Sequence, residues 1–241
     1  EHSVIPNWTD EQDIVPLPRE HPEVRRFREA HGMNGKFVVM YSGNIGLYYD
    51  LENLLKAVEP YRERTDLLFV FIGDGAVKPA LQRLARERGL NNVRFLPFQP
   101  KSALKYTLGA ADVHLVVSQS GIKGVSVPSK IYGVLAAGRP VLGVLEHGSE
   151  AERIVAESGC GYVVEPGDYS AFARTLAEMS ELPSARLDEM GGQGREYLEK
   201  RLRKQDSIAS YGRVLDGVLN QKRGFQDESF GHRRDQGQGG G

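Results

Sequence analysis

Short apolar runs alternate with segments of helical periodicity along this chain, and this alternation constrains its fold more than any other feature. The first run, residues 36–43, is apolar without interruption, as expected for a strand covered on both faces. Parallel strands joined by helices form a sheet with helices on both sides. The pattern therefore predicts an α/β fold, a doubly wound Rossmann-like domain with about six parallel strands. The predicted strands are residues 36–43, 66–75, 91–98, 111–120, 141–144 and 161–165.

The helical segments complete this pattern and then continue alone. After the sixth strand only helices are predicted, so a helical C-terminal segment follows the sheet. Gly191 and Gly192 are expected to interrupt one of these helices, because glycine is a poor helix former. The predicted helices are residues 50–58, 77–88, 101–108, 129–137, 149–159, 169–180, about 185–200 and about 205–220.

The two ends of the chain differ in composition from the part between them. Residues 1–30 begin as a proline-punctuated, extended stretch and are predicted to be a lead-in or linker. The Rossmann-like domain is predicted over residues 31–221. Residues 222–241 are polar and rich in Gly and Gln, which predicts disorder. Because the chain does not begin with Met, we expect it to be part of a longer polypeptide.

Charge and cysteine content exclude several classes of function. Lys and Arg number 31 against 32 Asp and Glu, so no basic field favours nucleic acid. Cys160 is the only cysteine, which excludes an intrachain disulfide and a cysteine cluster for zinc and favours a reducing, cytoplasmic compartment. The six histidines show no ligand spacing, so no metal is expected, and His114 is predicted to be a core residue. No signal peptide or membrane-spanning run is recognised.

Glycine-rich and polar loops follow the first four predicted strands. In a parallel sheet these loops meet at the carboxyl edge, where ligands bind. Any one of them can be a simple turn that needs glycine. The length of the fourth loop, together with the shared edge, favours a ligand site. The loops are residues 42–46, 73–75, 96–102 and 118–130.

The fourth loop carries the residues that best fit an anion. No G-x-G-x-x-G or P-loop motif is complete in the chain, which argues against a dinucleotide oxidoreductase and a P-loop NTPase. Pro128 is predicted in a first helical turn, with Ser126 or Ser129 as its cap. The Lys130 ammonium would add a full positive charge toward a diphosphate. The alternative is that Lys130 is an exposed residue of the first turn.

Seven motifs in series resemble one known family. Residues 4–168, and more loosely residues up to about 217, resemble the C-terminal, donor-binding domain of retaining glycosyltransferases with two Rossmann-like domains, the GT-B architecture of group 1, like family 4. The stretch VPSKIYGVLAAGRPV is most similar to bacterial enzymes of polysaccharide assembly that transfer amino sugars. The motifs are VIPNWTD, YSGNIGLYYDLENLLKA, FVFIGDG, VRFLPFQP, ADVHLVV, VPSKIYGVLAAGRPVLG and GCGYVVEPGD.

The resemblance implies roles for the loop residues. The first and fourth loops would hold the donor diphosphate, with Lys130 as the catalytic cation. The second and third loops would contact the nucleotide, with Phe98 as a wall for the base or, equally, a core aromatic. The implied diphosphate residues are Gly43, Asn44, Ile45, Gly46, Ser126, Val127, Pro128, Ser129 and Lys130, and the implied nucleotide residues are Gly73, Asp74, Gly75, Pro97, Phe98 and Gln99.

Two departures from the family pattern affect this interpretation. Many relatives have a Gly-Arg and then a Lys in the first loop, whereas Asn44 follows Gly43 here and no basic residue precedes Lys56. Many also have a Glu-x7-Glu motif, whose positions hold Val125 and Gly133. Lys130, with help from Lys123, would then carry most of the positive charge.

A role for Glu150 beside these loops stays open. Glu150 and Glu152 begin a predicted helix, and the helix dipole alone favours acidic residues there.

These features predict a donor-binding domain for retaining, metal-independent transfer from a nucleotide sugar, with uridine diphosphate as the family's usual carrier and no cofactor. The acceptor would be a glycan or lipid-linked, and its N-terminal domain is expected to be absent from this chain. Contact of the full-length protein with the inner membrane is plausible for such a role. Two alternatives stay open: a sugar-nucleotide 2-epimerase-like enzyme, and a degenerate, non-catalytic binding module.

Overall fold

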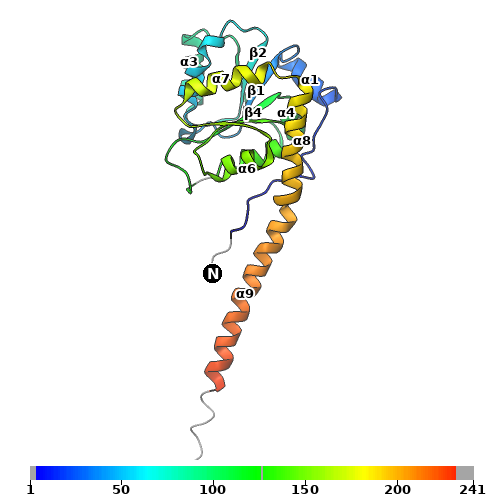
Figure 1. Ribbon diagram of the computed structural model, residues 1–241, viewed down its shortest axis with the longest axis vertical. Helices are drawn as coiled ribbons and strands as arrows, with labels where there is room; N and C mark the ends of the chain where they lie inside the picture. Colours follow the sequence, from blue (N-terminus) through cyan, green and yellow to red (C-terminus); the bar gives the residue numbers. More distant parts are fainter. Residues whose placement is uncertain (1–3, 126, 232–241) are drawn as a thin grey trace, which may run out of the picture. The chain divides into compact units, whose positions relative to one another are not determined.

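Six parallel strands form one sheet in the computed structural model, which describes residues 4–125 and 127–231, with side chains up to residue 219 (Figure 1). The strand order is β3-β2-β1-β4-β5-β6. The chain starts in the middle and changes direction between β1 and β4, which confirms the predicted doubly wound, Rossmann-like fold. The strands are β1 (Phe37–Ser42), β2 (Leu67–Ile72), β3 (Val93–Leu96), β4 (Val113–Val117), β5 (Val141–Val144) and β6 (Gly161–Val164).

The helices lie close to their predicted positions. The segment predicted as one helix over residues 101–108 begins as a 3-10 turn, and α1 was not predicted. The helical elements are α1 (Pro22–Ala30), η1 (Leu47–Tyr49), α2 (Leu51–Ala57), η2 (Glu59–Tyr61), α3 (Lys78–Glu87), η3 (Lys101–Ala103), α4 (Leu104–Gly109), α5 (Lys130–Ala136), α6 (Glu150–Ser158), α7 (Tyr169–Ser180), α8 (Ser184–Arg201) and α9 (Lys204–Gly231).

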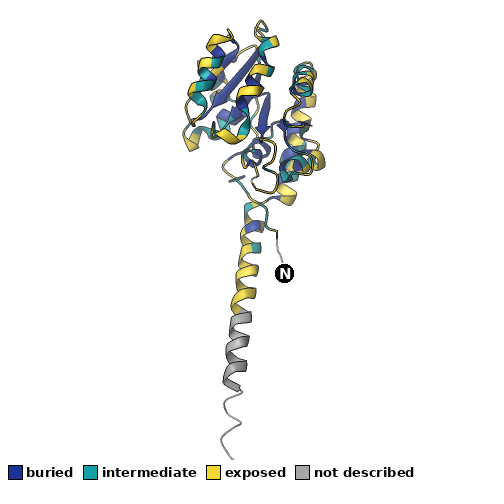
Figure 2. Cartoon of the chain, turned by 90° about the vertical axis from the view of Figure 1, so that its left-hand side faces the viewer, coloured by how far each residue is buried: buried dark blue, intermediate teal, exposed yellow. Residues whose placement is uncertain are grey.

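Both faces of the central strands β1, β2, β4 and β5 are buried, as their unbroken apolar runs predicted (Figure 2). Because side chains alternate along a strand, β2 supplies Phe69 and Phe71 to one face, where residues of α2, α3 and α7 pack. Leu68 and Val70 lie on the other face, with Val24 of α1. Each fully buried apolar side chain of this kind stabilises the fold by about 1.5–3 kcal/mol.

Helix α1 and residues 9–21 before it belong to the compact unit, so residues 9–30 of the lead-in predicted over 1–30 are part of the folded domain. The compact unit spans Thr9–Arg201. Val24 is fully buried. Oδ2 of Asp112 accepts a hydrogen bond from the amide of Val38 and lies 3.5 Å from Nη1 of Arg28. The Arg28 guanidinium also donates to the carbonyl oxygens of Ala110, Met33 and Lys36. These contacts fasten α1 to the sheet.

Helix α8 is continuous, so the predicted interruption at Gly191 and Gly192 is wrong. The reason is close packing rather than a break in the helix. A Cβ on Gly191 would lie 2.0 Å from the carbonyl oxygen of Gly138, and one on Gly194 would lie 2.8 Å from Cβ of Cys160. Glycine lets α8 approach the end of α5 at the cost of helix propensity.

Of the described residues, 4–8 and 202–231 belong to a second unit. Within it, the Ser207 hydroxyl donates to the carbonyl of Pro6, and the rings of Trp8 and Tyr211 meet edge to face. Helix α9 continues to Gly231, past residue 222 where disorder was predicted, because this stretch contains good helix formers such as Lys, Arg, Gln and Glu. The rest of the predicted tail, residues 232–241, lies outside the described residues. Among the described helices, none is long and apolar enough to cross a bilayer.

Candidate functional site

The loops after β1 and β2 meet at the carboxyl edge of the sheet through their backbones. The Ile45 amide donates to the Asp74 carbonyl at 2.8 Å, and the Gly43 amide donates to Ile72 at 2.9 Å. A Cβ on Gly73 would lie 1.9 Å from the Gly43 carbonyl oxygen, and Gly73 has a φ of 143°. Only glycine allows this approach. The amides of Gly43 and Ile45 therefore already donate to the end of β2 and to the loop after it, although the resemblance implied that both residues hold a diphosphate.

The third loop borders this pair, as the predicted edge requires. Phe98 is 58% exposed, which excludes the alternative of a core aromatic. A Cβ on Gly73 would lie 3.5 Å from Cε1 of Phe98, so the ring stands beside the second loop. Gln99 donates to the carbonyl of Pro97 and is tied to its own loop.

Lys130 enters the same edge from the fourth loop. Its Nζ donates to the Tyr41 hydroxyl at 2.9 Å and lies 4.3 Å from the centroid of the Tyr41 ring. The Tyr49 ring centroid is 3.8 Å from the same Nζ. A Cβ on Gly43 would lie 3.3 Å from Cε of Lys130, so the first loop covers the lysine stem. The structure thus joins Lys130 to the predicted first loop.

The electrostatics of Lys130 are unusual for a surface loop. No ion pair with a carboxylate involves it among the described residues, and burial lowers the pKa of its amine to about 7. Burial also raises the pKa of the Tyr41 phenol well above its usual range, so this neighbour stays neutral. A partly buried cation without a carboxylate partner favours an anionic ligand. The alternative of an exposed first-turn lysine is therefore wrong.

The local structure before Lys130 differs from the prediction. Helix α5 begins at Lys130, with Ser129 as its N-cap residue but without a capping hydrogen bond from that side chain. Pro128 precedes the helix and accepts the amide of Ile131 with its carbonyl. The predicted Pro128 in the first turn is therefore wrong, because the turn there is of the tighter 3-10 type. The candidate cap Ser126 lies outside the described residues.

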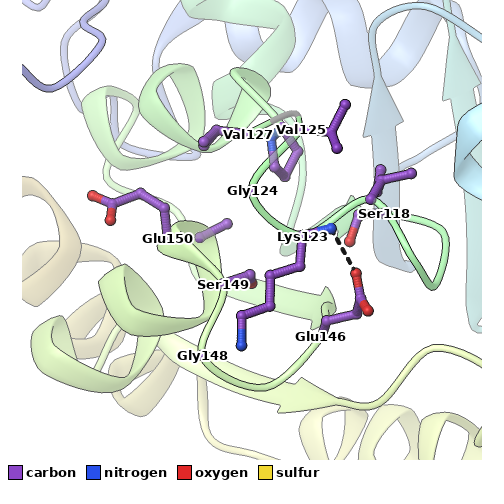
Figure 3. A pocket seen from close by; sticks show the side chains of 12 residues that line it. Ser118, Lys123, Gly124, Val125, Val127, Glu146, Gly148, Ser149 and Glu150 are labelled. Carbon is purple, nitrogen blue, oxygen red and sulfur yellow. Dashed lines mark hydrogen bonds between the residues drawn. The ribbon is translucent and has the colours of Figure 1, made fainter.

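A pocket of about 260 Å³ lies between the loops that follow β4 and β5 (Figure 3). Its walls include Lys123, Val127, Pro128 and Glu150, four of the residues named from the sequence. Lys130 does not line it. The predicted diphosphate residues therefore lie in two places. Val127 and Pro128 line the pocket, whereas Lys130 lies beside Tyr41 and Tyr49.

Lys123 and Glu150 already have partners in this pocket. The Lys123 ammonium donates to the carbonyl of His147 at 2.9 Å, and Glu150 accepts from Arg153 at 2.6 Å. The Glu150 carboxylate is thus ion-paired, whereas Lys123, which donates to a neutral carbonyl, differs from Lys130 in being exposed. Of the predicted cations, Lys130 alone combines burial with the absence of a carboxylate partner among the described residues.

Glu146 holds the fourth loop, and the sequence did not point to it. Its carboxylate accepts the amides of Gly121 and Lys123 at 3.0 and 2.9 Å, and the hydrogen bond from Gly121 chiefly lowers its pKa. Lys78 fixes the second loop in a similar way, because its Nζ donates hydrogen bonds to the carbonyls of Gly73 and Leu96. The available signals were an acidic residue just after a strand and a lysine at the start of a predicted helix.

The two positions of the family's Glu-x7-Glu motif are occupied by Val125 and Gly133. Val125 is 83% exposed on the fourth loop, and Gly133 lies within α5, where an added Cβ would lie 3.6 Å from Cδ1 of Leu108. Neither residue can supply a carboxylate. No group of three or more His, Cys, Asp or Glu side chains that could hold a metal ion occurs in the described part of the chain.

The family of this chain follows from its match to known proteins. Residues 23–197 match the family described as glycosyl transferases group 1. The match includes the whole sheet and all the loops described above. The chain belongs to this family, and its open, doubly wound fold is the expected scaffold.

Two curated relatives come from bacteria. WbjE of Pseudomonas aeruginosa, named as a probable glycosyltransferase, is 32% identical over 91% of this chain and 53% of its own length. WcaI of Escherichia coli K12, named as a putative glycosyl transferase of colanic acid biosynthesis, is 31% identical over 86% of this chain and 49% of its own length. The chain therefore spans about half the length of these relatives.

Solved structures share the fold at low sequence identity. Anabaena Alr3699/HepE, crystallised with UDP and glucose, superposes with a TM-score of 0.74 at 18% identity, over 89% of this chain and 56% of its own. The C-terminal domain of the group 1 protein LpcC from Francisella tularensis has a TM-score of 0.63 at 17% identity and is covered over 99% of its length, by 81% of this chain.

Proposed function

We propose that this chain is the donor-binding half of a glycosyltransferase and binds a nucleoside diphosphate sugar at the carboxyl edge of its sheet. Family membership and the names of the bacterial relatives support transfer in polysaccharide assembly. The fold shared with a structure that contains UDP and glucose supports a uridine diphosphate donor. The sugar and the acceptor would be defined with the other half of the protein.

The observation that carries this proposal is the unpaired amine of Lys130. Its Nζ has a hydroxyl and two aromatic faces around it, and no carboxylate pairs with it among the described residues. A diphosphate at this edge would supply the missing negative charge. The exposed ring of Phe98 stands two strands away along the edge, where it would form a wall for the base.

The chemistry of a retaining transfer assigns Lys130 its role. The bond between the anomeric carbon and the β-phosphate oxygen breaks, the acceptor oxygen bonds to the same face, and the acceptor hydroxyl passes its proton to the leaving diphosphate. Negative charge grows on the leaving diphosphate, so a nearby ammonium stabilises the transition state more than the bound donor. We expect this step to need no metal.

The test is calorimetric titration of the chain with UDP, GDP and ADP. We expect one nucleotide to bind saturably and Lys130→Met to weaken it by about 1–3 kcal/mol, as for a charge-assisted contact. Lys36→Met is the matched control. Lys36 precedes the amino end of β1, where its ammonium donates to the Thr65 carbonyl, so its loss should leave nucleotide affinity unchanged.

Other outcomes would favour other functions. Binding of no nucleotide would support a degenerate module, which the absent family Glu and Arg also favour. Equal weakening by Lys130→Met and Lys36→Met would show a general charge effect. Because the chain spans about half of its relatives, we expect it to bind donor and transfer nothing alone. Steady turnover by this chain would contradict that expectation.

A further inference from the structure

Two tyrosines from separate elements enclose the amine of Lys130. Tyr41 is the fifth residue of β1 and Tyr49 ends η1, and their rings meet edge to face with centroids 6.1 Å apart. The amine faces both rings, at 4.3 and 3.8 Å. We call Tyr41 and Tyr49 the tyrosine cage.

The cage stabilises a cation without neutralising it. The Tyr41 hydroxyl donates its proton to the carbonyl of Asn44 at 2.6 Å and accepts from Lys130. A ring face attracts a cation through its quadrupole, which carries no net charge. Tyr41 from β1 and Tyr49 from η1 are the titratable groups that face the amine in the described structure. When the amine is protonated, the cage therefore leaves its positive charge for a ligand to pair.

The turn that carries Tyr49 is fixed by the residue that follows it. The next residue, Asp50, has a φ of 43°, unusual for a residue with a side chain. Its carboxylate accepts from the Tyr169 hydroxyl and from Asn53 at 2.9 Å. Strain of this kind persists only where neighbours over-determine the backbone. The turn that presents the Tyr49 ring is therefore built rather than incidental.

We propose that Tyr49 is a positioning residue, whose ring holds the Lys130 amine beside the first loop. When an anion binds there, this amine takes up a proton. This inference rests on the proposed function, because the anion is taken to be the donor diphosphate. It adds a role for a residue that would touch neither the donor nor the reacting atoms.

The sign of the proton linkage follows from burial and charge. Burial lowers the pKa of free Lys130 to about 7, so at pH 8 most of the amine is neutral. A bound diphosphate favours the ammonium and raises this pKa, so the complex holds a proton that the free protein lacks. The second pKa of a phosphate lies near 6, so at pH 8 the nucleotide itself exchanges little.

The first experiment needs no nucleotide. Lysine labelled with carbon-13 at Cε is followed by NMR from pH 5 to pH 11 in the wild type, in Lys130→Arg to assign the signal, and in Tyr49→Phe and Tyr49→Leu. One lysine should titrate near pH 7 in the wild type and in Tyr49→Phe, which keeps the ring face. In Tyr49→Leu its midpoint should move toward the ordinary value, because the burial that lowers the pKa outweighs the attraction of the ring face and is reduced when the ring is lost. A wild type without any lysine titrating below pH 9 would overturn the cage.

The second experiment measures the linkage with UDP. Titrations at pH 8 in two buffers of different ionisation enthalpy should show uptake of roughly one proton for the wild type and Tyr49→Phe. Uptake should fall toward zero in Tyr49→Leu, and in Lys130→Arg, whose guanidinium stays charged. The wild-type affinity should weaken at least about tenfold from pH 7 to pH 9, whereas that of Lys130→Arg should not.

The outcomes separate this inference from the proposed function. If UDP binds, Lys130→Met weakens it and Tyr49→Leu takes up as many protons as the wild type, then the positioning role is overturned and the donor site stands. If no nucleotide binds although a lysine titrates near pH 7, the donor site and its proton linkage fall together while the cage remains. Unfolding of Tyr49→Leu would leave the decision to Lys130→Arg, in which persistent uptake refutes the linkage.

Discussion

At the residue scale, Gly73 decides how closely the first two loops approach. Its φ of 143° disfavours any side chain, and a Cβ would lie 1.9 Å from the Gly43 carbonyl oxygen. The atom in the way is backbone, which cannot rotate aside. The position that brings the second loop to the first therefore does not accommodate a side chain.

We expect Gly73→Ala to lower the free energy of unfolding by more than about 3 kcal/mol, because backbone strain and a steric clash combine. Gly89→Ala is the matched control. Gly89 has a φ of 64° but nothing within 4 Å of an added Cβ, so strain alone should cost about 1–2 kcal/mol. Chemical denaturation of both variants measures the difference. Equal losses would show that the approach of the loops adds nothing.

At the scale of elements, the long loop after β4 depends on one carboxylate. Glu146 accepts two amides of this loop, which lower its pKa. A carboxylate with a lowered pKa stabilises its contacts above its ordinary pKa and loses them as the pH falls below it. The loop that leads to Lys130 should therefore be well ordered at neutral pH and loosen in acid.

We expect Glu146→Ala to speed hydrogen exchange of the Gly121 and Lys123 amides by about tenfold, because both lose their acceptor. Exchange is followed by NMR at one pH near neutrality. Glu178→Gln on the exposed side of α7 serves as the control and should leave both amides protected. Unchanged protection in Glu146→Ala would mean that the turn holds itself.

Some elements and parts of the site could be predicted from the sequence and others could not, for physical reasons. The strands were predictable because both of their faces are buried and their apolar runs are unbroken. Helix α1 was not, because Val24 and Phe27 are its main apolar residues among charges. The positions of the loops could be predicted from the glycine residues that follow the strands. The tyrosine cage was not predictable, because Lys130 and Tyr41 are 89 residues apart and meet only when β4 lies beside β1.

At the scale of the whole molecule, His114 links the stability of the fold to pH. It lies in the middle of the sheet on β4, and its Nε2 is 2.9 Å from the carbonyl of Leu108. Burial lowers its pKa to about 4. Its ring is therefore neutral in the folded protein across the range in which an exposed histidine takes up a proton, near 6.5.

Between about pH 6.5 and pH 4 the unfolded chain binds a proton at His114 that the folded chain does not. The free energy of unfolding should therefore fall as the pH is lowered through this window, by up to about 3 kcal/mol. His114→Gln should remove this part of the slope, whatever it does to stability at pH 7. His147→Gln should keep it, because the His147 side chain is 87% exposed. Denaturation curves at pH 7, 6 and 5 test this, and equal slopes for the wild type and His114→Gln would locate the acid sensitivity of the fold elsewhere.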